Sequence, residues 1–182
     1  MAIVAKDSGD GFDREIPSAG LQDAVCTKIF DLGKHLNNFN GNLQHKVLFA
    51  WELAETIKEG KFAGQRFVVT KEYTLSLHEK ATLRKDIEGW RAKKIPDDTA
   101  RQGIDLEKFV KMQCTLAIQH ETGKNGSEYA KVASIAPVAK NAPMMHTELP
   151  DDWCPGWIKK KIDEGVGADG EVKPAEEEVP VF

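Results

Sequence analysis

Several features that mark common protein classes are scarce or missing in this chain of 182 residues. It contains no apolar run near the roughly 18 residues that a membrane-spanning helix requires. Its first residues, MAIVAKDSGDGFD, lack a basic stretch followed by an apolar one, so we expect no signal peptide. Its three cysteines, Cys26, Cys114 and Cys154, lie far apart and form no CxxC pair. Such a set argues against a disulfide framework or a zinc knuckle and is typical of thiols in a reducing cytoplasm.

Motifs that identify enzymes are also missing. The stretch GKFAG lacks the first glycine and the Lys-Ser/Thr ending of a P-loop, and neither GxSxG nor HExxH occurs. Cys114 and His120 would lie ~20 Å apart on one strand, at ~3.3 Å per residue, which is too far for a nucleophile and its base. A metal nuclease would need carboxylates such as Asp31, Glu52 and Glu72 to converge. We therefore predict no catalytic residue, no metal site and no cofactor.

Charge is distributed unevenly along a chain whose composition suits one globular domain with tails. Apolar residues make up 41% and charged residues 30% of the sequence. Residues 58–94 contain ten Lys/Arg and five Asp/Glu. Residues 161–182 contain seven Asp/Glu and two lysines. A basic segment is the electrostatic footprint of a polyanionic partner, although it can also be a solvated face. An acidic tail of this kind is usually a disordered interaction segment.

Alternation of apolar and polar residues predicts five strands. In HKVLFAWEL, residues 45–53, the apolar side chains from Val47 to Leu53 share one face, and Lys46 and Glu52 lie on the other. Similar patterns, rich in β-branched and aromatic residues, are separated by turns rich in Asn and Gly. The predicted strands are 21–32, 45–53, 65–75, 113–120 and 129–138.

A helical period replaces this alternation between the third and fourth strands. The stretch SLHE, residues 76–79, fits a capping box with Ser76 as N-cap. Leu83, Ile87 and Trp90 then form one apolar stripe on a helix of about four turns, which must end before Pro96. A shorter helical turn is expected over residues 106–110.

The resulting order, β-β-β-α-β-β, is that of the OB-fold, a five-stranded and partly open barrel. An SH3-like barrel is the main alternative, but it lacks a helix of this length at that place. We predict a mainly β fold with an irregular lead-in over 1–18 and an OB-fold domain over 19–140. A C-terminal extension over 141–164 carries Trp153 and Trp157, which either clamp a helix onto the barrel or meet a partner. A flexible acidic tail over 165–182 completes the chain.

The basic middle segment also contains aromatic residues, and both kinds of side chain are needed to hold a single strand without reading its sequence. In an OB-fold, strands two and three form the middle of the binding face. The apolar face around Trp51 favours a core position for that ring, whereas Phe62 lies in a loop between Lys61 and Gly64 and is expected to be exposed. The candidate DNA-binding residues are Lys46, Trp51, Lys58, Lys61, Phe62, Arg66, Phe67, Lys71, Tyr73, Lys80 and Arg84.

The chain ends in AEEEVPVF, an acidic run followed by proline and a terminal aromatic. This ending resembles the acidic tip of bacterial and phage single-stranded DNA-binding proteins. In the bacterial family, Ile-Pro-Phe follows the acidic run; here one extra residue separates Pro180 from Phe182. The body, with KVLFAWEL and TLSLHEKATLRKDIEGWR, is similar in style to phage replication-region proteins. The resemblance implies that the tip recruits replication or recombination proteins. The residues that would do so are Glu176, Glu177, Glu178, Pro180 and Phe182.

We therefore expect non-catalytic, salt-dependent and sequence-tolerant binding of single-stranded DNA in phage replication or recombination. The expected location is the host cytoplasm, without membrane association, and a homodimer through exposed strand edges stays open. The alternative is a protein-interaction module, such as a phage adaptor or an inhibitor of a host enzyme, that binds no DNA.

Overall fold

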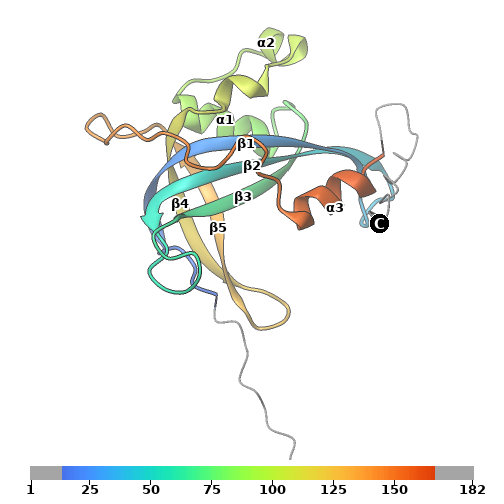
Figure 1. Cartoon of the computed structure of the whole chain (residues 1–182). Coiled ribbons are helices and arrows are strands. Elements are labelled where there is room, and N and C mark those ends of the chain that lie inside the picture. The colour runs from blue at the N-terminus through green and yellow to red at the C-terminus, as the bar shows by residue number, and fades with distance from the viewer. Residues whose placement is uncertain (1–13, 167–182) are drawn as a thin grey trace, which may run out of the picture.

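The computed structural model describes residues 14–166. Its strands form a single curved sheet. Helices α1 and α2 lie at one end of this sheet, and α3 lies across the strands (Figure 1). In chain order they are β1 (Gly20–Leu36), β2 (Leu43–Thr56), β3 (Arg66–Thr74), α1 (Thr82–Arg91), α2 (Asp97–Gln102), the short 3-10 helix η1 (Leu106–Phe109), β4 (Gln113–Thr122), β5 (Glu128–Ala136) and α3 (Gly156–Glu164).

The five strands form one antiparallel sheet in the order β3-β2-β1-β4-β5. The long strand β1 belongs to both halves, because its first residues pair with β4 and those from Ala24 to Leu36 pair with β2. Two register shifts against β2 interrupt this second pairing, and such bulges bend a strand and increase its twist. The edge strands β3 and β5 come within 8 Å of each other between Cα atoms but share no ladder. The sheet is therefore strongly curved and remains open.

The predicted mainly β architecture and the order of its five strands and central helix are confirmed, but several boundaries differ, most of all the end of β1 and the start of α1. Strand β1 runs past residue 32 to Leu36, through Gly33 at φ +74°, a conformation that suits glycine. Helix α1 begins at Thr82 rather than after Ser76. The Ser76 hydroxyl instead accepts a hydrogen bond from the backbone N–H of His78 and forms a local turn.

The inner face of the sheet and α1 enclose the main core. The predicted stripe of Leu83, Ile87 and Trp90 is buried against the sheet, where Trp90 also donates from Nε1 to the carbonyl of Gln113 at 2.9 Å. The ring of Trp90 lies 6.2 Å from that of Trp51 on β2. Full burial of each large apolar side chain contributes about 1.5–3 kcal/mol, so this stripe fixes α1 on the sheet.

A second, smaller cluster covers the outer face of β1 and β2. Residues 141–166, here called the C-terminal arm, cross this face and end in α3. Ile158 of α3 is buried together with Leu32 and Leu48, and the ring of Trp153 lies 6.1 Å from that of Phe30. Trp153 therefore helps to clamp α3 onto the sheet, which is one of the two roles considered for the tryptophans of this extension. Trp157 is exposed on α3.

Helix α1 approaches β5 so closely that only glycine fits at one position, which yields a stability test. A Cβ on Gly89 would lie 2.6 Å from the carbonyl oxygen of Ile135. In an open helix, Gly→Ala stabilises by about 1 kcal/mol. Here we expect Gly89→Ala to lower the free energy of unfolding by about 1–3 kcal/mol, as overpacking does.

Urea unfolding of Gly89→Ala and of Lys85→Ala, an exposed position on the same helix, measures this difference. The control should change stability by less than about 0.5 kcal/mol. A Gly89→Ala protein as stable as wild type would contradict the close packing of α1 on β5.

Candidate nucleic-acid interface

Three of the aromatic residues predicted to stack on bases lie in the main core. Trp51, Phe67 and Tyr73 project from β2 and β3 into the core between the curved sheet and α1, where they are buried. The hydroxyl of Tyr73 donates to Asp86 at 2.7 Å, and burial together with this carboxylate raises the pKa of Tyr73. An enclosed ring has no face left for a base. The structure therefore removes these three residues from the candidate interface.

Four of the predicted cations are engaged within the protein. Lys71 shares the inner face with Tyr73 and lies 2.6 Å from Asp86 of α1. Lys46 donates to the hydroxyl of Thr74 at 2.8 Å. Arg84 binds Glu88 and Asp97, and Arg66 binds Glu148 of the C-terminal arm.

The C-terminal arm occupies the outer face of β2 and β3, which was the predicted middle of the binding surface. It is held there by Glu52, whose buried carboxylate accepts the backbone N–H groups of Glu148 and Leu149 at 2.9–3.0 Å. Arg66 adds a bond of 2.7 Å to the carbonyl of His146. A buried carboxylate must be paired in this way to be tolerated. The arm is thus bound to this face of the sheet, and a ligand can reach only the parts of the face that the arm does not cover.

The loop between β2 and β3, residues 57–65, leaves three predicted residues exposed: Lys58, Lys61 and Phe62. Phe62 is 53% exposed, and the ammonium of Lys61 lies 5.6 Å from its ring centre. The carboxylate of Glu15 accepts the backbone N–H groups of Lys58 and Glu59 and fixes the start of the loop. This loop keeps a cation beside an accessible ring, as predicted from the sequence.

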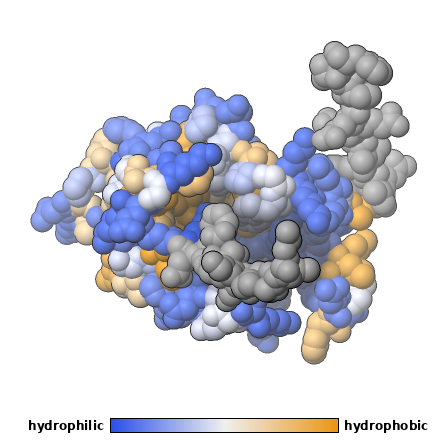
Figure 2. All heavy atoms as spheres, turned by 60° about the horizontal axis from the view of Figure 1, so that its bottom comes forward, coloured by the Kyte–Doolittle hydropathy of each residue, from blue (hydrophilic) through white to orange (hydrophobic). Residues whose placement is uncertain are grey.

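The turn between β1 and β2 exposes a ring that the sequence reasoning missed. Phe39 is 98% exposed, and the cross-strand pair Leu36 and Leu43 beneath it is 61% and 52% exposed. We call residues 36–43 the hairpin tip. Figure 2 shows a mostly hydrophilic surface with apolar side chains gathered on a projection at its right, the side on which this turn lies in Figure 1.

The hairpin tip is braced by local hydrogen bonds. The side-chain oxygens of Asn37 and Asn40 accept the backbone N–H groups of Phe39 and Asn42, and Asn37 and Asn42 also pair through their backbones at 2.8 Å. Asparagine forms such turns readily. The ring is therefore presented by a fixed backbone rather than by a loose loop.

A sequence signal for this site existed. Residues 32–51 contain no Asp or Glu, although the chain has 29 of them, and they include Lys34, His35, His45 and Lys46. Within this acid-free stretch, Phe39 stands among asparagines, where a turn leaves nothing to bury it.

The described residues do not assemble the carboxylate cluster that a metal nuclease would use. Within residues 14–166, no three His, Cys, Asp or Glu side chains converge as a metal site. Asp31 binds His45, Glu72 binds Lys161, and Glu52 binds the C-terminal arm. In the same range, no helix is long and apolar enough to cross a membrane. The proposed tip residues Glu176, Glu177, Glu178, Pro180 and Phe182 lie outside the described residues.

No protein-family model matches this sequence, and no curated protein is significantly similar to it. The function must therefore be argued from the residues of this chain and their geometry.

The attachment of the C-terminal arm through Glu52 predicts a local effect of substitution. Glu52→Gln replaces a charged acceptor by an amide whose NH₂ group faces backbone donors. We expect a loss of about 1–3 kcal/mol in stability and faster hydrogen exchange at the amides of Glu148 and Leu149. Glu148→Gln, which alters an exposed ion pair, serves as the control and should cost less than about 1 kcal/mol. Unchanged exchange in Glu52→Gln would show that Glu52 does not hold the arm.

The ion pairs that Glu88 of α1 forms predict a dependence of stability on pH. The carboxylate of Glu88 accepts the backbone N–H of Ile95 and binds Lys94 and Arg84, which lowers the pKa of Glu88 from 4.5 to about 2. Its contribution is therefore complete above the unfolded-state pKa and is lost as pH falls from about 4.5 towards 2. The difference in unfolding free energy between wild type and Glu88→Gln should narrow over this range in urea titrations. A difference independent of pH would contradict this account.

Proposed function

We propose that the sheet is an OB-fold barrel with an incomplete seam. Three features support this proposal: the order β3-β2-β1-β4-β5, the sharing of β1 between both halves, and the helix between β3 and β4 that covers one end. In the OB-fold the barrel is partly open, and here β3 and β5 approach without forming a ladder.

We propose that the protein binds single-stranded DNA without sequence preference, as a phage replication or recombination factor. The hairpin tip is the observation that carries this proposal. It presents Phe39 on a fixed backbone within a stretch that has lysines and no acid. Every base offers a π-face to such a ring, and base–aromatic stacking contributes about 1–3 kcal/mol per base. In OB-folds the loop between strands one and two takes part in oligonucleotide binding.

The loop of residues 57–65 supplies a second contact. Phe62 offers another exposed ring, and Lys58 and Lys61 offer cations to phosphates. The hairpin tip and this loop lie at opposite ends of the 14-residue strand β2, roughly 43 Å apart along the strand. The C-terminal arm covers the face between them, so the strand would contact the two loops rather than the middle of the sheet.

The acidic tip is proposed to recruit replication or recombination proteins. This part of the proposal rests on the resemblance of AEEEVPVF to the tips of single-stranded DNA-binding proteins.

A protein-interaction module is the second candidate, because Leu36, Phe39 and Leu43 also form an exposed apolar group. Exposed apolar groups often mark protein contacts. The lack of acids and the surrounding asparagines and lysines favour a polyanion over a protein pocket at this place.

The test is an anisotropy titration of a labelled dT oligonucleotide with wild type, Phe39→Ala and Phe39→Tyr. Removal of one stacking ring should weaken binding by about 5- to 150-fold, equivalent to about 1–3 kcal/mol. Tyrosine keeps the π-face and should restore most of the affinity. Leu21→Ala, which removes another exposed apolar side chain from β1, serves as the control and should bind like wild type.

Wild-type affinity should also fall steeply with salt, because bound phosphates release counterions. Failure of the wild-type protein to bind dT at micromolar concentration would overturn the function. Equal affinity of wild type and Phe39→Ala would remove the hairpin tip from the interface.

A further inference from the structure

The segment from Lys80 to Lys94 pairs its acids with neighbours and leaves cations facing solvent. Both acids of this segment have partners: Asp86 binds Lys71 and Tyr73 of β3, and Glu88 binds Arg84, Lys94 and the backbone of Ile95. Four exposed cations remain, and no carboxylate of residues 14–166 forms an ion pair with them. They are Lys80, Lys85, Arg91 and Lys93, here called the α1 ridge.

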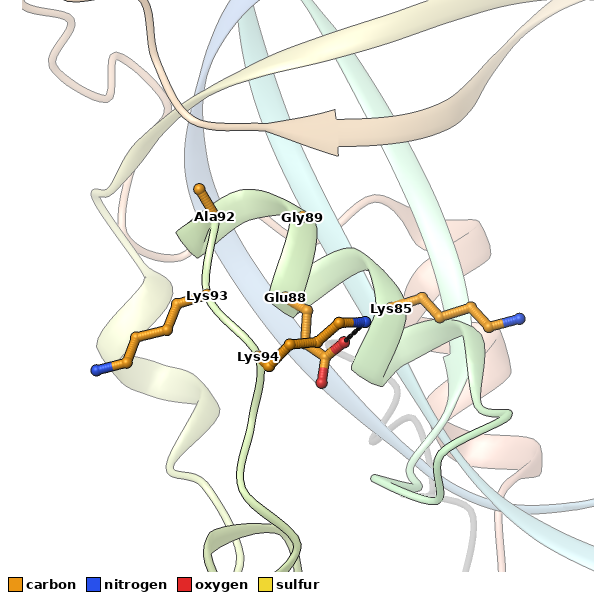
Figure 3. Close-up of a pocket in the computed structure, with 6 residues that line it drawn as sticks. All are labelled: Lys85, Glu88, Gly89, Ala92, Lys93 and Lys94. Atoms are coloured by element: carbon orange, nitrogen blue, oxygen red, sulfur yellow. Dashed lines mark hydrogen bonds and ion pairs between the residues drawn. The ribbon is translucent and has the colours of Figure 1, made fainter.

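The side chains at the end of α1 surround an open hollow of about 370 Å³. Figure 3 shows Lys85 and Lys93 extending to opposite sides of this hollow, with Lys94 lying over Glu88 between them. The ammonium of Lys94 is 3.0 Å from that carboxylate. The hollow is therefore bordered by three lysines, and its one acid is already neutralised.

The base of the α1 ridge is rigid. Gly89 packs on the backbone of β5, and Trp90 is buried in the main core. The bond of 2.9 Å from the Ile95 N–H to Glu88 fixes the chain just beyond the helix. Lys85 and Arg91 lie on α1, whereas Lys80 precedes the helix and Lys93 follows it. A polyanion bound by these cations would order little of the backbone, so binding would cost little conformational entropy.

We propose that the α1 ridge is a third contact with single-stranded DNA, one that binds its phosphates and is separate from the two loops. The inference rests on the proposed function. The charge of the ridge fits phosphates, and Trp90, the one aromatic residue between Lys80 and Lys94, is buried, so this contact involves no stacking. In Figure 1 the loop of residues 57–65 and α1 lie at opposite ends of the molecule. We expect a short oligonucleotide, held by one of the two loops, not to reach the ridge, whereas a long one does.

The experiment compares two oligonucleotides, one of about 6 and one of about 30 nucleotides, since OB-folds occupy ~4–16 nucleotides each. The variant is the triple substitution Lys85→Gln, Arg91→Gln and Lys93→Gln. The matched control, Arg101→Gln, Lys108→Gln and Lys160→Gln, loses the same charge at other exposed positions. Circular dichroism melting verifies the fold of both proteins. The readout is the slope of log affinity against log salt concentration.

For single strands, each phosphate contact adds about 0.7 to the magnitude of this slope. With the long oligonucleotide, the slope of the ridge variant should therefore be smaller in magnitude than that of wild type by about 2. It should match the control with the short one. An unchanged slope with the long oligonucleotide would overturn the ridge contact alone. Equal loss with both lengths would also overturn it, because the ridge would then belong to the primary site.

If the ridge instead holds the acidic residues of the chain's own tail, the triple variant would bind the long oligonucleotide more tightly than the control. This result would overturn the proposal as well. Absence of binding by wild type to either oligonucleotide would overturn the proposed function, and the ridge contact with it.

Discussion

The central strands of the sheet are apolar on both faces, and this constraint shapes the rest of the molecule. Every residue of β2 from Val47 to Leu53 is buried. A strand of this kind needs two covers, so α1 packs on the inner face and the C-terminal arm packs on the outer face. The one charge in this run, Glu52, is tolerated because it binds the backbone of the arm. As a result, the two most exposed rings, Phe39 and Phe62, lie in loops, while the sheet exposes Tyr129 on its edge strand β5.

Periodicity in the sequence predicted the five strands and the apolar stripe of α1, because alternation and helical spacing are local properties. It did not predict that the C-terminal arm covers the outer face, because this packing depends on contacts between residues about 100 positions apart, such as Glu52 and Leu149. A local sign was present: VLFAW is continuously apolar, and such a run is typical of a strand buried on both faces. Phe67 and Tyr73, two of the candidate DNA-binding residues, share a face with Lys71, and a charged residue on a strand face favours exposure of that face. That lysine instead reaches Asp86 of α1, a pairing that no local pattern shows.

The exposure of the candidate interface residues was predicted in part. Lys58, Lys61 and Phe62 are exposed where the sequence placed them, because a short polar loop rich in glycine has nothing to bury them. The sequence analysis missed Phe39 because the asparagine-rich stretch around it indicates only a break between strands. The arrangement as a whole separates two kinds of contact. Exposed rings on fixed loops can stack on bases, and the cations of α1 can hold phosphates, since the acids beside them are already paired.

The most direct test of this account is to map the contact by NMR, following backbone amide shifts of the full chain as a dT oligonucleotide is added. We predict shifts concentrated at the hairpin tip, in residues 57–65 and along α1, with little change in the C-terminal arm or at Glu72, which binds Lys161 of the arm. Large shifts throughout residues 141–166, together with new ones on β2 and β3, would contradict the account. They would show that the arm leaves its face and that DNA binds in the middle of the sheet.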